Sequence, residues 1–349
     1  MGNTNTGRAF IGSFTSAGGR GIIAAAVDGT TGALTETGAS DALADPSYLT
    51  LATAPGGPVL YAVSETSEGA VAAFDVQGSA PRPIGGRVPV CGAGPTHLTY
   101  SDGHLLTANY GSGSVSVLPV KTGGEPDAAS GVLQHEGAGP HPDRQRGPHA
   151  HQVLPDPSGR WVLGVDLGTD AVRVFALDPE AGELTQHRET ALRPGTGPRH
   201  LAFHPAGTHA YVLNELEPTL TVCRWDADTG VLEPVGETPV LPDGADGPVY
   251  PSEVVVSHDG RHLWAANRGH DSIAVLALDE SGERPELITT VPCGGHWPRD
   301  LVLDPTGRRL YAANERSGNV TWFDIDPDTG VPHRAGSLDA PAASCVVFA

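Results

Sequence analysis

Polar and charged side chains recur at two equivalent positions of a repeated segment in this 349-residue chain. When four copies are aligned on a glycine in their first turn, the position eight residues before that glycine holds His151, Arg199, Ser252 and Arg299. The position eight residues after the glycine holds Leu167, Glu215, Arg268 and Glu315. Core positions of a repeat are filled by interchangeable residues, but these differ in charge from copy to copy. Imidazole, carboxylate and guanidinium groups can together transfer a proton and stabilise an anion.

The repeated segment has the pattern of short β-strands. Each copy has a Pro, a short apolar run, a turn containing Gly with Asp or Pro, and a second apolar run that ends in Asn or Asp. Apolar runs of this length between turn residues predict strands. Copies begin at Pro46, Pro95, Pro148, Pro198, Pro251 and Pro298, and these starts lie 43 to 53 residues apart if a tail copy at Pro341 is included. A period of about 40–50 residues with four strands per unit is typical of a β-propeller.

The two ends of the chain complete each other in this pattern. Residues 8–14, 21–27 and 33–39 match the second, third and fourth strands of a unit, whereas the tail 341–348 (PAASCVVF) matches a first strand. The sequence therefore predicts an all-β, seven-bladed propeller over residues 1–349 as a single domain. Each blade has four antiparallel strands, and the C-terminal strand closes the ring inside the N-terminal blade.

This architecture places the two polar positions together. Consecutive strands joined by a tight turn are antiparallel, so the first strand starts at the end of the blade where the second strand stops. Because the first strand of a blade is innermost, both positions should ring one mouth of the central channel. Two interpretations of the charges stay open, a reactive site and an ion-pair network that ties neighbouring blades together. The Asn or Asp that ends each second strand is typical of turn chemistry.

Composition excludes several classes of function. With 21 Lys and Arg against 41 Asp and Glu, the formal charge is −20, which argues against nucleic acid and anionic membranes as partners. The first ten residues contain neither the basic nor the apolar region of a signal peptide, and nothing approaches the roughly 18 apolar residues of a membrane helix. Four widely separated cysteines predict free thiols in a reducing compartment. We therefore expect a cytoplasmic protein, with an insertion at 120–146 forming a surface loop on the binding face.

Four motifs carry a resemblance to a known family. They are GPHPDRQRGPHAH from Gly139, GPRHLAFHP with YVLNEL from Gly197, SEVVVSHDG with ANRGHDSIAV from Ser252, and PRDLVLDPTGR with AANERSGNV from Pro298. Together, over essentially the whole chain, they resemble the seven-bladed propeller lactonases, which include bacterial 6-phosphogluconolactonases and fungal carboxy-muconate lactonising enzymes. By motif, the resemblance implies a catalytic site of His151, Arg199, Glu215 and Arg268. The sequence departs from the family pattern at Gln152, where Ser is common, and at Asp300, where Asn is common.

The resemblance implies a lactone substrate, and the residue types suggest how it reacts. We expect His151 to be the general base for water, Glu215 to orient it, and the two arginines to bind an anion and stabilise an oxyanion; Glu215 as the base stays open. Candidate substrate-binding residues are Asn109, Arg144, His149, Asn214, Glu253, Asn267, Arg299 and Asn314. No ligand spacing for a metal is visible, so no metal or cofactor is expected, and we expect a monomer or weak homodimer. The alternatives are a lactonising cycloisomerase acting on a muconate-like substrate and a non-catalytic binding platform.

Overall fold

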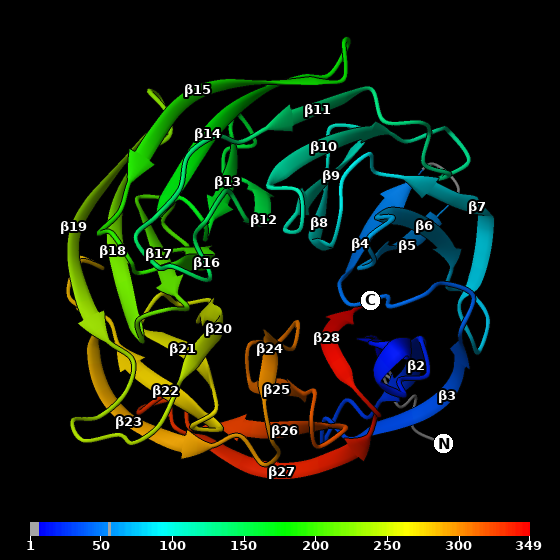
Figure 1. The fold of residues 1–349 in the computed structure, drawn as a ribbon. Helices are drawn as coiled ribbons and strands as arrows, with labels where there is room; N and C mark the ends of the chain where they lie inside the picture. The colour runs from blue at the N-terminus through cyan, green and yellow to red at the C-terminus, as the bar shows by residue number, and fades with distance from the viewer. Residues whose placement is uncertain (1–6, 55–56) are drawn as a thin grey trace.

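The computed structural model describes residues 7–54 and 57–349 and contains seven four-stranded antiparallel sheets. The sheets form a ring around a central channel, with the first strand of each blade nearest the axis (Figure 1). The predicted seven-bladed propeller is therefore confirmed. Residues 1–6, which contributed to the expectation about targeting, lie outside the described residues. In the described part of the chain, no helix is long and apolar enough to cross a membrane.

Each blade contains four strands, named below from the innermost outward. Blade 1 contains β28 (Ala343–Phe348), β1 (Gly7–Ser13), β2 (Ile22–Val27) and β3 (Leu34–Ser40), with a short 3₁₀ helix η1 (Thr15–Ala17) after β1. Blade 2 contains β4 (Leu49–Ala54), β5 (Gly57–Ser64), β6 (Ala70–Asp75) and β7 (Arg82–Pro89). Blade 3 contains β8 (Pro95–Ser101), β9 (His104–Asn109), β10 (Ser114–Pro119) and β11 (Gly131–Gln134). Blade 4 contains β12 (Ala150–Pro155), β13 (Val162–Asp166), β14 (Ala171–Asp178) and β15 (Glu183–Ala191).

The other three blades repeat this arrangement. Blade 5 contains β16 (Pro198–Phe203), β17 (His209–Asn214), β18 (Thr219–Asp226) and β19 (Val231–Pro239). Blade 6 contains β20 (Tyr250–Val256), β21 (His262–Arg268), β22 (Ser272–Ala277) and β23 (Glu286–Pro292). Blade 7 contains β24 (Pro298–Leu303), β25 (Arg309–Asn314), β26 (Asn319–Ile325) and β27 (Pro332–Asp339).

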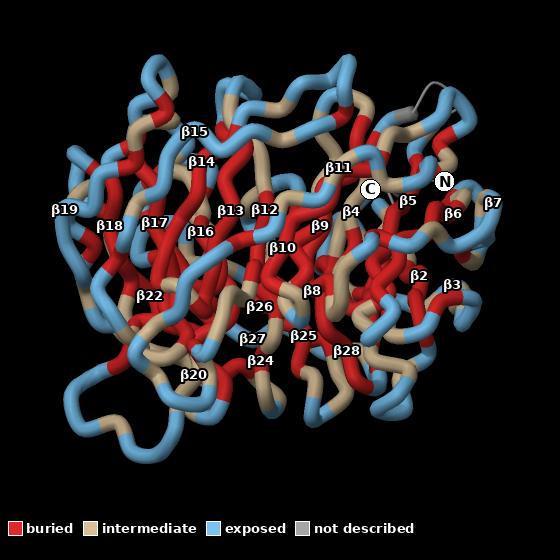
Figure 2. Tube along the Cα trace, turned by 45° about the horizontal axis from the view of Figure 1, so that its top comes forward, coloured by how far each residue is buried: buried red, intermediate tan, exposed pale blue. Residues whose placement is uncertain are grey.

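Burial follows the position of a strand in its blade. Every residue of β13, a second strand, is buried, whereas the outermost β15 is mostly exposed, and Figure 2 shows the same contrast between buried inner segments and exposed outer ones. The apolar side chains form seven clusters, each of which joins two neighbouring blades. The stabilising burial therefore runs around the ring, which is how a chain of this length avoids the size limit of one globular core.

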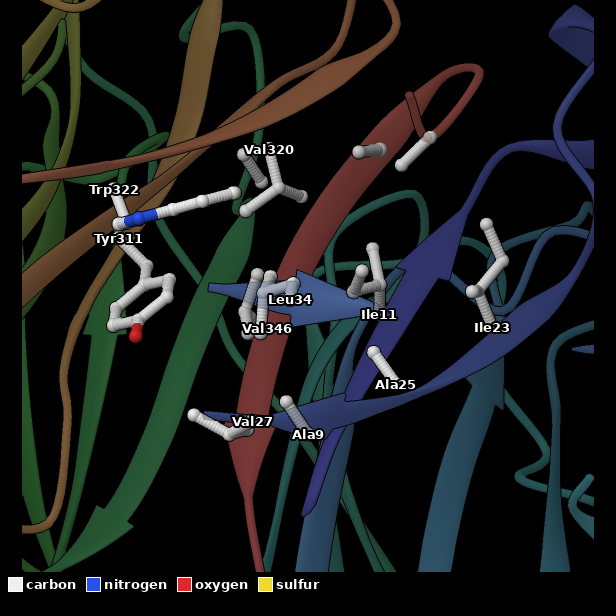
Figure 3. Close-up of a cluster of buried hydrophobic side chains, with 13 residues drawn as sticks. Ala9, Ile11, Ile23, Ala25, Val27, Leu34, Tyr311, Val320, Trp322 and Val346 are labelled. Atoms are coloured by element: carbon white, nitrogen blue, oxygen red, sulfur yellow. The ribbon is translucent and has the colours of Figure 1, made fainter. Parts of the chain in front are cut away.

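The C-terminal strand closes the ring as predicted. β28 pairs antiparallel with β1, so the last strand of the chain is the innermost strand of blade 1. Figure 3 shows Val346 of β28 in a cluster with Ile11 of β1 and with Tyr311 and Trp322 of blade 7. Closure leaves no free sheet edge between the first and last blades, and it buries the apolar faces of both.

The Asp-x-x-Gly turns between first and second strands are structural, as expected. In blade 7 the Asp304 carboxylate accepts backbone N–H groups of Arg308 (2.9 Å) and Arg309 (3.1 Å), and Gly307 has φ 69°. Only glycine adopts this left-handed conformation without strain. The turns lie at the end of the blades opposite to the predicted site, and they fix the register that aligns each first strand with its second strand.

Candidate active site

A β-bulge recurs near the start of the innermost strands. In β8, β12, β16 and β24 the pairing with the second strand skips one residue, and these residues are Thr96, His151, Arg199 and Arg299. In β20 the pairing jumps from Pro251 to Val254, and in β28 it skips Ser344. A bulge leaves its extra residue out of the ladder and redirects the side chain. The polar position found in the sequence is therefore the bulged residue of the inner strands.

The second polar position lies at the same end of the blades. This position directly follows the second strand in six blades and is the last residue of that strand in blade 6. Around the ring it holds Phe14, Glu65, Tyr110, Leu167, Glu215, Arg268 and Glu315. Charged residues of this set contact bulged residues, as Glu215 does with Arg199 and Glu315 with Arg299, so both positions meet at one mouth of the channel. The sequence prediction of a shared mouth is correct in this respect.

Glu215 is the centre of the charged cluster. Its Oε2 lies 2.8 Å from Nη2 of Arg268 and 3.2 Å from Nε of Arg199, and its Oε1 accepts a hydrogen bond of 2.6 Å from Nη2 of Arg144. Three guanidinium groups from blade 5, blade 6 and the segment before blade 4 therefore share one carboxylate. Such charge-assisted contacts are strong where water is excluded, and the Glu215 side chain is only 6% exposed.

The two inner arginines are also fixed by backbone carbonyls. Nε of Arg268 donates to the carbonyl of Tyr250 (2.9 Å), and Nη1 of Arg199 donates to the carbonyl of Ser252. The guanidinium of Arg268 also lies 5.5 Å from the ring centre of Trp297. Each fork thus has a defined orientation before a ligand binds, which is the preorganisation that oxyanion stabilisation needs.

Arg299 forms a second, looser cluster on the other side of the mouth. Its Nη2 lies 3.5 Å from Oε2 of Glu65, its Nη1 lies 3.5 Å from Oε2 of Glu315, and its guanidinium stacks 4.9 Å from the ring centre of Phe14. With Arg144, Arg199 and Arg268, four arginines face the three glutamates at 65, 215 and 315. The mouth therefore carries one surplus positive charge inside a strongly acidic protein.

The predicted insertion brings Arg144 to the cluster. It contains β11 and then a compact loop, in which Gln145 donates to the carbonyl of Leu167 (2.8 Å). The loop is anchored by Asp166, which accepts the backbone N–H of His149 (2.9 Å) and contacts buried His135 at 2.6 Å. Asp166 therefore supports the segment that carries Arg144 and does not itself contact the charged cluster.

The two candidate histidines lie beside Tyr110. The ring of His149 stacks on Tyr110 with centroids 4.4 Å apart, and the ring of His151 meets Tyr110 edge-on at 5.6 Å. His151 is 5% exposed, and its Nδ1 has no hydrogen-bond partner among the described residues. A buried polar nitrogen without a protein partner needs another partner, such as an ordered water molecule.

The electrostatic environment sets the charge state of each group. Burial opposes ionisation of Glu215, but Arg268, Arg199 and Arg144 outweigh it and lower the pKa of Glu215 to about 2. Burial, followed by the charge of Arg199, lowers the pKa of His151 well below 6.5. Burial and repulsion from Arg268 and Arg299 lower the pKa of Arg199 to about 9. At pH 7 the mouth therefore combines a neutral imidazole, a carboxylate and cationic arginines.

Several candidate ligands from the sequence lie inside the blades instead. The side chains of Asn109, Asn214, Asn267 and Asn314 are fully buried. Their amides donate to the third strand or a neighbouring backbone group, as in the bonds from Asn214 to Thr219 (2.9 Å) and Thr221 (3.0 Å). This geometry gives no support to a direct role in substrate binding. These Asn side chains also do more than stabilise a turn, because their amides form hydrogen bonds between second and third strands. Glu253 lies beneath the mouth, in contact with His200 at 2.7 Å.

Some residues at the mouth were missed by the sequence analysis. Tyr110 and Glu65 occupy the same repeat position as Glu215, so aligning the looser copies would have found them. Trp297 stands at a repeat position where Gly94 and Gly197 also have positive φ (56° and 59°), so the residue type is exceptional and the position is not. The backbone of Trp297 has φ 65°, and its backbone N–H donates to the carboxylate of Asp271 (2.8 Å). The indole ring contacts the guanidinium groups of both Arg268 and Arg316, and that of Arg316 lies 3.4 Å from the ring centre. A tryptophan in this backbone region is strained, and such strain persists where surrounding contacts hold the residue in place.

Two hollows adjoin the cluster. An open groove lies between the insertion and the loop before β20, and it is lined by Arg144, Tyr250, Leu216 and Val249. A closed cavity of about 10 Å³ lies beneath the arginines, and this is close to the minimum for one water molecule. A larger hollow, lined by Asp28, Asp304 and Arg309, lies at the opposite end of blades 7 and 1. Among the described residues, no group of three or more His, Cys, Asp or Glu side chains could hold a metal ion.

Comparison with known proteins agrees with this fold. The model of the seven-bladed β-propeller lactonases matches residues 8–348. The chain is 33% identical to the 6-phosphogluconolactonase of Bacillus subtilis, over 97% of each chain. The periplasmic gluconolactonase of Pseudomonas aeruginosa has a TM-score of 0.90 at 29% identity, and a Lactobacillus plantarum protein has a TM-score of 0.92 at 29% identity, each covering 99% of both chains. The chain therefore belongs to the seven-bladed β-propeller lactonase family.

Proposed function

We propose that this protein hydrolyses an anionic, sugar-type lactone at the mouth of the channel, by attack of water and without a metal ion. The observation that carries the proposal is the Glu215 carboxylate held by three arginines beside a neutral imidazole. The surplus positive charge suits a carboxylate or phosphate on the substrate. Relatives named 6-phosphogluconolactonase and gluconolactonase support a sugar lactone.

The reaction follows from the roles of these groups. A water molecule attacks the lactone carbonyl while the imidazole of His151 takes its proton, and the carbonyl electron pair moves to oxygen. Arg199 and Arg268 stabilise that oxyanion. Its collapse breaks the ring C–O bond, and the leaving alkoxide takes the proton from His151. Lactone and water thus give one hydroxy acid, and the histidine is restored.

Glu215 acts as an orienting group in this scheme. A carboxylate with a pKa near 2 is a weak proton acceptor at pH 7. Its contacts with Arg199, Arg268 and Arg144 instead fix the positions of the forks that bind the anion. This favours His151 over Glu215 as the general base, the alternative that the sequence left open.

Kinetics of two variants test the proposal. Removal of one guanidinium contact to a bound anion costs about 1.5–3 kcal/mol, so Arg268→Ala should raise KM for a carboxylated lactone by roughly ten- to a hundredfold. A neutral lactone of the same ring size should be affected far less. His151→Ala should mainly lower kcat, by roughly a hundredfold or more. Arg146→Ala, which removes an exposed arginine that pairs with Asp143 outside the Glu215 cluster, is the matched control.

The pattern across substrates decides the outcome. Equal losses on the charged and the neutral lactone for Arg268→Ala would show that this arginine does not recognise the substrate's charge. An unchanged kcat for His151→Ala would exclude this histidine as the base. Circular dichroism of each variant confirms that the fold is intact before the constants are compared.

A further inference from the structure

A second ring of polar side chains lies one residue further along the inner strands. The position after the bulged residues holds His97, Gln152, His200, Glu253, Asp300 and Cys345, and Tyr48 directly before β4 is its equivalent in blade 2. All but Tyr48, at the edge of β4, are at most 6% exposed. This layer lies against the closed cavity beneath the arginines, which is lined by Tyr48, His200, Glu253 and Asp300.

Side chains of the second ring form hydrogen bonds between neighbouring blades on one side of the ring. Gln152 of blade 4 accepts the backbone N–H of Leu201 in blade 5 (2.7 Å). His200 of blade 5 contacts Glu253 of blade 6 through Nδ1 and Oε2 at 2.7 Å. Asp300 of blade 7 accepts the backbone N–H of Val346 in blade 1 (2.8 Å). Between blades 6 and 7, the carboxyl groups of Glu253 and Asp300 line the same closed cavity of about 10 Å³, where each carboxyl influences the other.

A link between two carboxyl groups requires a proton. Two ionised carboxylates offer only acceptors and repel each other, whereas one shared proton supplies the missing donor. We propose that Glu253 and Asp300 carry a single proton between them at neutral pH and form a monoanionic pair that positions Arg199 from below. The guanidinium of Arg199 lines the same cavity, and its positive charge favours the ionised form of both carboxyls. The two residues are positioning residues, since they lie beneath the groups that would touch the substrate.

The hydrogen-bond pattern places the proton on Asp300. Both oxygens of Glu253 already have partners, since Oε1 accepts the backbone N–H of Val254 (3.0 Å) and Oε2 faces His200. The Nε2 of His200 has no partner in the described part of the chain, which fits a neutral ring with its proton on Nδ1. Asp300 uses one oxygen for Val346, and its other oxygen is available to donate to Glu253.

The groups facing the pair agree with a shared proton. Arg199 and His200 come from blade 5, Arg299 from blade 7, and Tyr48 and Cys345 from blades 2 and 1; His97 and His151 face His200 from blades 3 and 4. Burial raises the pKa of Glu253 to about 7 although Arg199 opposes it. Burial, followed by the charge of Glu253, raises the pKa of Asp300 well above 3.8.

The charge of the pair matters for the mouth above it. A monoanion beneath the mouth keeps the site as a whole from becoming negative, so that the arginines facing the substrate can still bind an anion, whereas a dianion makes the whole site negative. A negative site repels an anionic substrate, and in a dry site this effect is strong. This consequence rests on the proposed function, but the protonation of the pair does not.

Asp300→Asn is the direct test of the shared proton. An asparagine can keep the bond from Val346 and donate its amide N–H to Glu253, so it imitates protonated Asp300 without the proton. Infrared spectra of the wild-type protein in D₂O at pH 6 should show a carbonyl band of a buried protonated carboxyl that Asp300→Asn removes. The exposed Asp328→Asn serves as control and should leave the band unchanged. A band that persists in Asp300→Asn would overturn the assignment.

Stability gives a second readout that is independent of activity. A carboxyl with a raised folded-state pKa binds its proton more tightly when folded, so its stabilising contribution is present at low pH and is lost as pH rises through the folded pKa. Between pH 4.5 and 7 the melting temperature of the wild type should therefore fall relative to that of Asp300→Asn. Glu253→Gln should be less stable than Asp300→Asn, because Gln cannot satisfy the same donors. The reverse order would place the proton on Glu253 and contradict the proposal.

The pH dependence of KM tests the link to function. In the wild type, KM for a carboxylated lactone should rise by about tenfold as pH rises through the raised pKa of the pair, and it should stay level in Asp300→Asn. Parallel KM profiles in the two proteins would exclude a role of the pair in positioning Arg199. If no lactone is hydrolysed at all, the infrared and melting results still decide the protonation.

Discussion

At the scale of single residues, the mouth shows how charges are kept in a buried site. Glu215 and Arg199 are almost fully buried, and an isolated ion there would be very unfavourable. Each charge is stabilised by ion pairs or hydrogen bonds with residues of neighbouring blades. The ion-pair network and the candidate active site are therefore the same set of contacts. The two interpretations left open by the sequence are therefore compatible.

The depressed pKa of His151 leads to a prediction about turnover. Burial and Arg199 favour the neutral imidazole, so the base should remain available well below pH 6.5 and should be lost only when pH falls through the lowered pKa. At saturating carboxylated lactone, kcat should stay level from pH 8 to below 6.5, with spontaneous ring opening subtracted. An acid limb centred at pH 6.5 or above would contradict this environment for His151.

Residue identity was predictable only where the repeat or the family motif marked it. His151, Arg199, Glu215 and Arg268 were found because their positions recur and their types vary. Trp297 was not, because its importance lies in a strained backbone and in contacts with two arginines, which the sequence does not show. The contacts of the buried Asn side chains could not be predicted, since the sequence shows where a strand ends but not which hydroxyls lie opposite.

At the scale of elements, the fold was predictable because each blade is a nearly self-contained copy. The period and turn glycines predicted the strands, and the unmatched strand at 341–348 predicted the closure that β28 makes. The insertion was harder, because no other copy resembles it. The sequence indicated a surface loop, but not that the loop contains β11 or that Arg144 reaches Glu215.

Closure of the ring can be tested by removing β28. This strand pairs with β1 and places Val346 and Cys345 in two apolar clusters. Deletion of residues 343–349 exposes both faces of blade 1 and should cost on the order of 5 kcal/mol or more. We expect the cooperative thermal transition to be lost or strongly lowered, whereas deletion of Ala349 alone should have little effect. An unchanged melting temperature after the longer deletion would exclude this role for β28.

At the scale of the whole molecule, charge is distributed in two opposed ways. The protein has a formal charge of −20, but the described mouth has four arginines against three glutamates. An anionic substrate therefore gains nothing from long-range attraction, and its binding depends on the arginines at the mouth. The ring makes this possible, because seven blades each contribute one inner strand to a single small area.

The central claim is most directly tested by measuring ring opening of three lactones of one ring size, one phosphorylated, one carboxylated and one neutral. Each should be followed by proton release, with and without exhaustive chelation of divalent ions. The account predicts a kcat/KM for the charged lactones at least about tenfold above that for the neutral one, with no loss in chelator. Equal rates on all three lactones, or activity that disappears in chelator and returns with a divalent ion, would contradict it.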